Sequence, residues 1–351
     1  MKINRLVMIL LFSLLAVVLT SCSGAGVTNS WSGVTAAEDL IYFSDGAAVF
    51  ALRSDSGNTA WKYPEKANAK RLFYAEPVVA GEQVIVVDYA NTMASLNAQT
   101  GVETWVFEGA KGRYVDCPLI LDNLIIAPNA DYSLYALDLS GKLVWKFETG
   151  HALWARPSTD GETLYFASMD RNFYAVDVAS GTMKWKKELH SSSVARALLD
   201  ESTVYVGNLE GKLFAFNTAD GSLVWEQQLG GGIWSAPLLH EGKLYIGDQT
   251  GRISILTSVD GKVVQFIETG SAILGAGVVL DNGVAFGNED GSLVVIGFDG
   301  ARLWTRSFDG KLYSNLQMNG DHILLSLSQG EKPLLAVDLN GNEIWNFSDK
   351  K

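Results

Sequence analysis

The side chains that most often carry out chemistry fit no catalytic pattern in this sequence. It contains no HExxH, CxxC or G-x-S-x-G motif and no glycine-rich phosphate loop between a strand and a helix. The histidines do not fall at metal-ligand spacing; they are His151, His190, His240 and His322. Two acidic, glycine-containing segments, 281–283 and 288–291, offer oxygen ligands for calcium, but we favour hairpin turns there. We therefore expect no catalytic residues and no metal site.

A second set of residues could bind rather than react. Aromatic residues recur at one position of a unit of about forty residues, with Tyr114 one residue out of line; the others are Trp31, Tyr74, Trp154, Trp234 and Tyr313. Two positions further on, where most units have small residues, three units carry a charge, and Asp116 lies beside this row. The three charged residues are Glu76, Arg156 and Arg196.

Two interpretations of these charges stay open. They could pair with one another and fill the space between the repeats. Alternatively, they could form a mixed-charge pocket with an aromatic rim, because exposed Trp, Tyr and Arg recur at binding hot spots. In the second case the pocket would take a peptide, a glycan or a small polar ligand, with Trp154, Arg156, Arg196 and Trp234 at its centre.

The elements that would position these residues follow from the repeat itself. Tryptophan recurs about forty residues apart, with one gap that Gln265 fills; the tryptophans are Trp61, Trp105, Trp145, Trp185, Trp225, Trp304 and Trp345. A glycine stands four residues before each of these eight positions, at Gly57, Gly101, Gly141, Gly181, Gly221, Gly261, Gly300 and Gly341. The chain therefore contains eight copies of one unit between residues 31 and about 348. Gln265 reflects either drift in one repeat or a loosened blade contact that accommodates a partner.

Apolar residues alternate within each unit in short runs that turn residues separate. The sixth unit shows four such runs, at 236–239, 243–247, 253–256 and 263–268. A period of two residues in runs of this length predicts strands, and four antiparallel strands in forty residues fit a propeller blade. The glycine permits a left-handed turn, and the following tryptophan can pack its ring against the neighbouring blade. We therefore predict an all-β fold, an eight-bladed β-propeller spanning residues 31–351.

These corners resemble the tryptophan-docking motif of pyrroloquinoline-quinone-like (PQQ-like) repeats. Examples are Ala175-Val176-Asp177 followed by Gly181 and Trp185, and Ala336-Val337-Asp338 followed by Gly341 and Trp345. Eight such corners resemble the propellers of quinoprotein dehydrogenases and of the BamB lipoprotein family. The dehydrogenases imply a quinone cofactor, calcium and usually a pair of adjacent cysteines, which this sequence lacks. We therefore predict no cofactor and disfavour PQQ and calcium.

The first 21 residues are typical of a secretory signal peptide. Lys2 and Arg5 precede an apolar run that is shorter than the roughly twenty residues needed to cross a bilayer. The segment Leu19-Thr20-Ser21-Cys22 resembles a bacterial lipobox, which implies cleavage before Cys22 and acylation of that cysteine, including palmitate. Residues 22–30 would then be a lipidated tether. The resemblance implies an outer-membrane location in a diderm host, and otherwise the outer face of the cytoplasmic membrane.

Composition excludes one class of partner. Of 351 residues, 48% are hydrophobic and 19% are charged, and the formal net charge is −12. Because no basic run or stripe is present, nucleic-acid binding is disfavoured. We predict a non-enzymatic, lipid-anchored scaffold that binds an envelope protein or complex, as the resemblance to BamB implies for outer-membrane protein assembly. The alternatives are a propeller that binds a ligand or carbohydrate and a reduced quinoprotein oxidoreductase.

Overall fold

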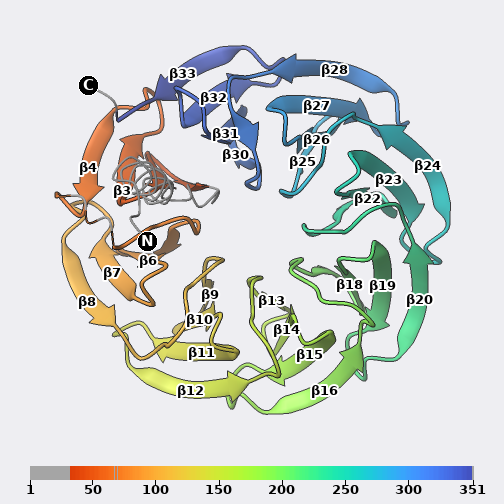
Figure 1. Ribbon diagram of the computed structural model, residues 1–351, viewed down its shortest axis with the longest axis horizontal. Coiled ribbons are helices and arrows are strands. Elements are labelled where there is room, and N and C mark those ends of the chain that lie inside the picture. Colours follow the sequence, from red (N-terminus) through yellow and green to blue (C-terminus); the bar gives the residue numbers. More distant parts are fainter. Residues whose placement is uncertain (1–31, 67, 69, 350–351) are drawn as a thin grey trace, which may run out of the picture. The chain divides into compact units, whose positions relative to one another are not determined.

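The computed structural model describes residues 32–66, 68 and 70–349, and the regular elements in these residues are β-strands. The strands form eight antiparallel sheets that follow one another around a ring (Figure 1). The predicted eight-bladed propeller is therefore confirmed. The described part of the chain holds no helix long and apolar enough to span a bilayer. The predicted signal peptide, Cys22 and the tether fall outside the described residues.

Each blade is built from consecutive strands, numbered from the centre of the ring outwards. Blade one consists of β1 (Gly33–Ala37), β2 (Leu40–Asp45), β3 (Ala48–Arg53) and β4 (Thr59–Tyr63). Blade two consists of β5 (Val78–Ala80), β6 (Gln83–Val87), β7 (Met93–Asn97) and β8 (Glu103–Phe107). Blade three consists of β9 (Leu119–Leu121), β10 (Leu124–Pro128), β11 (Ser133–Asp138) and β12 (Leu143–Glu148). Blade four consists of β13 (Ser158–Thr159), β14 (Thr163–Ala167), β15 (Asn172–Asp177) and β16 (Met183–Glu188).

The second half of the ring repeats this plan. Blade five consists of β17 (Leu198–Asp200), β18 (Thr203–Gly207), β19 (Lys212–Asn217) and β20 (Leu223–Gln228). Blade six consists of β21 (Leu238–His240), β22 (Lys243–Gly247), β23 (Arg252–Thr257) and β24 (Val263–Glu268). Blade seven consists of β25 (Val278–Leu280), β26 (Gly283–Gly287), β27 (Ser292–Gly297) and β28 (Arg302–Ser307). Blade eight consists of β29 (Lys311–Leu312), β30 (Gln317–Asn319), β31 (His322–Ser328), β32 (Leu334–Asp338) and β33 (Glu343–Phe347), with β29 and β30 both pairing with β31.

The core lies between the blades. The middle strands of each blade are buried on both faces, because each face packs against a neighbouring blade. Between blades four and five, for example, Tyr165 and Phe173 pack with Val204 and Phe214 in one cluster. The outer strands expose most of their side chains and bury mainly the tryptophan. Each blade therefore depends on its neighbours to cover its apolar faces.

The predicted docking tryptophans lie against the corner glycine of the next blade. Trp185 of β16 lies over Gly221 at the corner of blade five, where a Cβ atom would meet the ring at 2.8 Å. Its indole N–H also donates a hydrogen bond of 2.9 Å to the carbonyl of Thr218. Six of the tryptophans donate in this way to the next blade, at 2.9–3.1 Å. Gly221 has a φ of 68°, so both backbone conformation and space require glycine.

Gln265 occupies the same place with different chemistry. Its side-chain amide lies over Gly300, and Nε2 donates a long hydrogen bond of 3.5 Å to the Gly300 carbonyl. Two larger neighbours accompany the smaller side chain. Ile255 stands opposite Gln265, where Ala215 faces Trp225 in blade five. Phe298 at the next corner stacks on His240 with ring centroids 3.7 Å apart. These contacts favour repacking of one repeat over a loosened blade.

The ring closes through side chains rather than through a shared strand. The C-terminal strand β33 is the outer strand of blade eight, as its final tryptophan predicts. Trp345 of β33 donates to the carbonyl of Ser54 in blade one at 3.1 Å, and Phe347 packs on Phe50 with centroids 4.8 Å apart. Near the centre, Ser326 donates to the Ser32 carbonyl at 2.8 Å. Blade eight therefore meets blade one by the same contact that joins the other blades.

We expect Trp185→Ala to lower the free energy of unfolding by about 3–5 kcal/mol, because it removes a buried ring and its hydrogen bond from a blade contact. The matched change Gln265→Ala should cost less than about 1 kcal/mol, since this side chain is largely exposed and its neighbours fill the corner. Urea unfolding followed by tryptophan fluorescence measures both values. Equal losses in the two variants would show that the corner contact does not couple the blades.

Candidate functional site

A pocket of about 90 Å³ lies at the centre of the ring, where the loops lead into the innermost strands. The side chains around it come from the position at which the sequence repeats aromatic residues. Its walls include Tyr74, Val115, Trp154, Val194, Trp234, Leu274 and Tyr313. Close packing explains the small residues between them: a Cβ atom at Gly33 would lie 2.4 Å from the backbone nitrogen of Glu76. The repeat therefore aligns these residues correctly in space.

From blade two to blade eight, the pocket walls alternate in character, and the equivalent residue of blade one, Trp31, lies outside the described residues. Blades two, four, six and eight contribute the aromatic residues Tyr74, Trp154, Trp234 and Tyr313. Blades three, five and seven contribute the aliphatic residues Val115, Val194 and Leu274. Trp154 and Trp234 are half-buried, so part of each ring is accessible. We call this arrangement the aromatic cup.

Charged side chains meet at the bottom of the aromatic cup. Arg196 donates from Nη2 to Asp116 Oδ1 at 2.5 Å and from Nε to Asp116 Oδ2 at 2.9 Å. The same Nη2 donates to Glu76 Oε2 at 3.1 Å, which links blade five with blade two. Asp116 Oδ2 also accepts the backbone N–H of Arg156 at 2.6 Å. We call Glu76, Asp116, Arg156 and Arg196 the central charge cluster.

Two uncharged side chains complete this cluster. Asn315 donates to Glu76 Oε1 at 2.7 Å and accepts the Ala276 N–H at 2.8 Å, so it joins three blades. The Cys117 thiol lies 3.6 Å from Glu76 Oε2 and 3.7 Å from Arg156 Nη1. Burial raises the pKa of Cys117 to about 12, so this thiol stays protonated at neutral pH. Cys117 is therefore packed within the cluster as a neutral thiol, and it is not ionised as a thiolate nucleophile would be.

The electrostatics follow from burial and pairing. Burial opposes ionisation of Asp116, but Arg196 and the N–H of Arg156 outweigh it, so the pKa of Asp116 lies below its usual value. Burial also opposes the charge of Arg196, whereas Asp116 and Glu76 raise the pKa of Arg196 well above its usual value. Asp116 and Arg196 therefore stabilise each other's charged form. This geometry favours the interpretation in which the charges pair and fill the centre.

Two of the residues predicted from sequence do not reach the aromatic cup. Tyr114 is fully buried between blades two and three, with Cys117 and Tyr135 in the same cluster. A shift of one residue in an extended segment turns a side chain to the opposite side, which explains its position. Arg156 does not line the pocket; its guanidinium packs on Cys117 beneath it. Tyr114 and Arg156 are therefore not among the residues that line the aromatic cup.

A neighbouring group, Arg113 with Tyr89, lies on the rim of the aromatic cup without a signal in the repeat. Arg113 lies with its guanidinium carbon 5.3 Å from the centre of the Tyr89 ring and 5.7 Å from that of Trp154. Tyr89 in turn meets Tyr74 edge to face at 5.0 Å. Neither Arg113 nor Tyr89 stands at a repeated aromatic or charged position, so the repeat gives no signal for them. They extend the aromatic cup over blades two and three.

The central charge cluster predicts a large effect of removing one charge. Arg196→Met should lower the free energy of unfolding by about 3–5 kcal/mol, because it leaves Glu76 and Asp116 buried without compensation. The double variant that adds Glu76→Gln to Arg196→Met should recover part of this loss, since the remaining charge of Asp116 is then opposed by Arg156. Urea unfolding at pH 7 tests both variants. A loss below about 1 kcal/mol for Arg196→Met would contradict the pairing.

The pH dependence of the free energy of unfolding gives a second test of the pairing of Asp116. Because the pKa of Asp116 is lower in the folded than in the unfolded chain, its contribution is fully present above the unfolded value near 4. It is lost as the pH falls through the lower, folded-state pKa. Asp116→Asn should therefore lose this part of the acid dependence of unfolding.

Comparisons with known proteins agree with this architecture. The family model described as "Outer membrane protein assembly factor BamB" matches residues 23–193 and 174–265, which together span more than half of the chain. No curated protein matches the sequence. Among solved structures, BamB from Moraxella catarrhalis superposes with a TM-score of 0.73 at 18% identity, covering 85% of this chain and 91% of that one.

Two further solved structures share the fold. The computationally designed protein Ika8 has a TM-score of 0.77 at 14% identity and covers 88% of this chain and 96% of its own. A europium-containing methanol dehydrogenase has a TM-score of 0.71 at 12% identity, covering 84% of this chain and 81% of that one. At these identities the likeness concerns the fold alone. The family match and the eight tryptophan-type corners together show that this chain belongs to the BamB family of PQQ-like repeat propellers.

Proposed function

We propose that this protein is a lipid-anchored, non-catalytic scaffold that holds an envelope protein partner during outer-membrane protein assembly. The observation that carries the proposal is that the central charges satisfy one another, with Arg196 bridging Asp116 and Glu76. The chemistry left accessible is the aromatic surface of the cup, which suits binding better than reaction. The family description and the BamB structure support assembly of outer-membrane proteins as the setting.

Three features support a function without a quinone cofactor. The pocket measures about 90 Å³, whereas pockets for small ligands and cofactors usually measure roughly 300–1,000 Å³. Arg196, the cation that could face a quinone oxygen, is held by two carboxylates. The sequence also lacks the adjacent cysteines that the dehydrogenase resemblance implies. These observations support a function without PQQ.

A ligand-binding propeller is the second candidate. The alternation of aromatic and aliphatic walls favours it, because aromatic faces can stack on the apolar face of a sugar ring or other planar group. The small volume restricts such a ligand to one inserted group rather than a whole molecule. The same property suits a single anchoring side chain of a protein partner, so the aromatic cup is consistent with the scaffold.

The first experiment is affinity capture of the full, acylated chain from its native membrane after chemical cross-linking, followed by mass spectrometry of proteins and small molecules. We expect barrel-assembly components to be recovered with it. An unfolded variant is the control, because non-specific capture would survive loss of the propeller. Recovery of a quinone or a saccharide without any protein partner would contradict the scaffold and move the function to the aromatic cup.

Membrane attachment through Cys22 has its own test. Cys22→Ser removes the residue that the lipobox resemblance assigns to acylation, so the protein should move from the membrane fraction to the soluble exported fraction. Ser23→Cys in the Cys22→Ser background is a positional control and should not restore attachment. Labelling with a palmitate analogue measures acylation directly. Retention of label by Cys22→Ser would show that another residue carries the lipid.

A further inference from the structure

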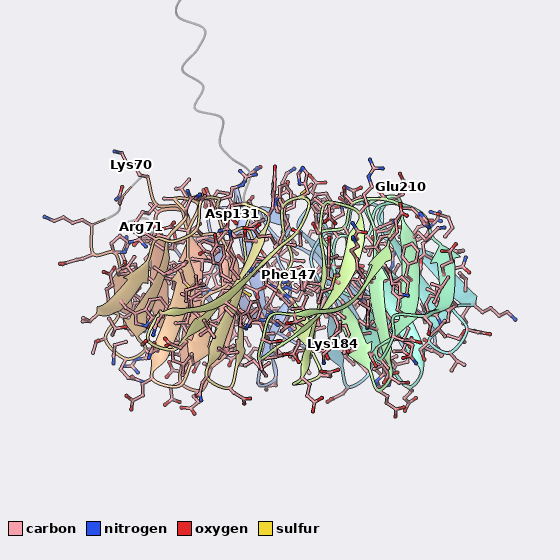
Figure 2. All side chains as sticks on the ribbon, turned by 90° about the horizontal axis from the view of Figure 1, so that it is seen from below. Lys70, Arg71, Asp131, Phe147, Lys184 and Glu210 are labelled. Carbon is pink, nitrogen blue, oxygen red and sulfur yellow. The ribbon has the colours of Figure 1, made fainter. Side chains whose placement is uncertain are left out.

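The turns on one face of the ring are rich in carboxylates. Figure 2 shows Lys184 towards one face and Lys70, Arg71, Asp131 and Glu210 on the opposite one. The Lys184 face is formed by the hairpins between first and second strands and by the turns between third and fourth strands. Each of the eight hairpins has a carboxylate in or beside it, as have all the third-to-fourth turns except that of blade two. We call this the acidic face and the other the pocket face.

On the pocket face, the hairpin carboxylates of blades two to four are engaged within the protein, whereas Glu108, on the loop after β8, is exposed. Asp88 accepts Arg71 Nε at 2.6 Å and the N–H groups of its own hairpin. Asp131 accepts the Lys111 N–H at 2.8 Å and the Tyr135 hydroxyl at 2.6 Å. Asp170 of blade four accepts the Gly150 N–H and the Tyr174 hydroxyl in the same way. Much of their negative charge is therefore neutralised locally.

The cationic side chains of the same region are not engaged in such contacts. The side chains of Lys70, Lys111, Arg113 and Arg171 are exposed and form no ion pair or hydrogen bond with residues 32–66, 68 or 70–349. In a chain with a net charge of −12, this part of the pocket face therefore presents available positive charge. A negatively charged group would be attracted here and repelled by the acidic face.

Arg113 gives this surface its specificity. Its guanidinium lies near both the Tyr89 and the Trp154 rings, which hold it at the rim of the aromatic cup. The N–H groups of a planar guanidinium match the two oxygens of a carboxylate. Trp154 is also a wall of the aromatic cup, so an acidic group on Arg113 would place its neighbour beside the apolar walls.

We propose that the pocket face over blades two to four docks an acidic segment of the partner protein. A carboxylate of the segment binds Arg113, and an adjacent apolar side chain enters the aromatic cup. This inference rests on the proposed scaffold function and specifies its surface. An anionic membrane fits less well, since such surfaces attract clusters of about 4–8 neighbouring Lys and Arg. Here the free cations lie on separate loops around a concavity.

The test uses the full acylated chain in its native cells with benzoylphenylalanine, a photo-cross-linker, at Tyr132. This residue is 45% exposed, and its hairpin bonds to the Arg113 carbonyl through Ala130 at 3.1 Å. The control position is Val259, which is 83% exposed on the acidic face. We expect a cross-link from position 132 to a segment with Asp or Glu beside an apolar residue, and no comparable product from 259.

Charge reversal then identifies the contact. Arg113→Glu should reduce the cross-link by about tenfold or more, as expected for a hot-spot residue. Lys142→Glu makes the same charge change at an exposed residue of the acidic face and should leave the yield unchanged. Changing the acid of the cross-linked segment to Lys should restore the product in the Arg113→Glu background. Circular dichroism verifies that both variants fold.

Several results would overturn the docking surface. These are the absence of a specific product at 132, a cross-linked segment without a carboxylate, and equal yields for Arg113→Glu and Lys142→Glu. Flotation of the Cys22→Ser protein with phosphatidylglycerol vesicles that is lost in Arg113→Glu would assign the surface to membrane instead.

If barrel-assembly components are still captured while Arg113→Glu has no effect, the scaffold stands and this surface is wrong. If no such component is captured but an acidic segment of another protein docks at Arg113, the surface stands and the proposed setting is wrong.

Discussion

The contact of a tryptophan ring with a glycine of the next blade governs this structure. Each blade is a small sheet whose middle strands are apolar on both faces, so none is stable without its neighbours. The ring buries a large surface at each corner, and the glycine lets the backbone approach it closely. Because blade eight meets blade one through Trp345 and Gly57 in the same manner, one local contact repeated around the circle both stabilises the blades and closes the ring.

Because the corner contacts stabilise the fold, the residues at the centre of the ring are less constrained by stability. Stability comes from the corners, so the residues that lead into the innermost strands are constrained mainly by space and by the need to compensate charge. Buried charges are tolerated there because Arg196, Asp116 and Glu76 form a closed set with Asn315. The charged side chains at the centre therefore have their hydrogen bonds made within the protein, and the walls of the cup next to them include aromatic residues. Such a centre can vary between relatives without loss of the fold, which explains why one architecture accompanies different functions.

Sequence periodicity was sufficient for the fold and for part of the candidate site. The strands of the sixth blade lie within one or two residues of their predicted positions, because turn glycines and alternating apolar residues specify them locally. The row of Tyr74, Trp154, Trp234 and Tyr313 was found in the same way, since repeats place equivalent residues at equivalent radii. The repeat alone does not show that Tyr114 is buried between blades, where an offset of one residue turns its side chain away from the cup. Arg113 was missed because its partners, Tyr89 and Trp154, come from different blades.

The same reasoning explains why the turns of one face are rich in carboxylates. Asp and Asn side chains satisfy the N–H groups of tight turns, and Asp177 and Asp338 do so at the third-to-fourth corners. A repeated fold therefore repeats a structural carboxylate, and the acidic face follows from turn chemistry rather than from a ligand. The second-to-third hairpins of the pocket face have the same requirement, which Asn129 and Asn208 meet without a charge and Asp88 and Asp248 meet with one. Asp131 and Asp170 on this face accept hydrogen bonds from N–H groups of neighbouring loops. Arg113, in contrast, packs near aromatic rings that leave its N–H groups available. Recognition of an acidic partner would then be confined to one face by the electrostatics of the turns on the other.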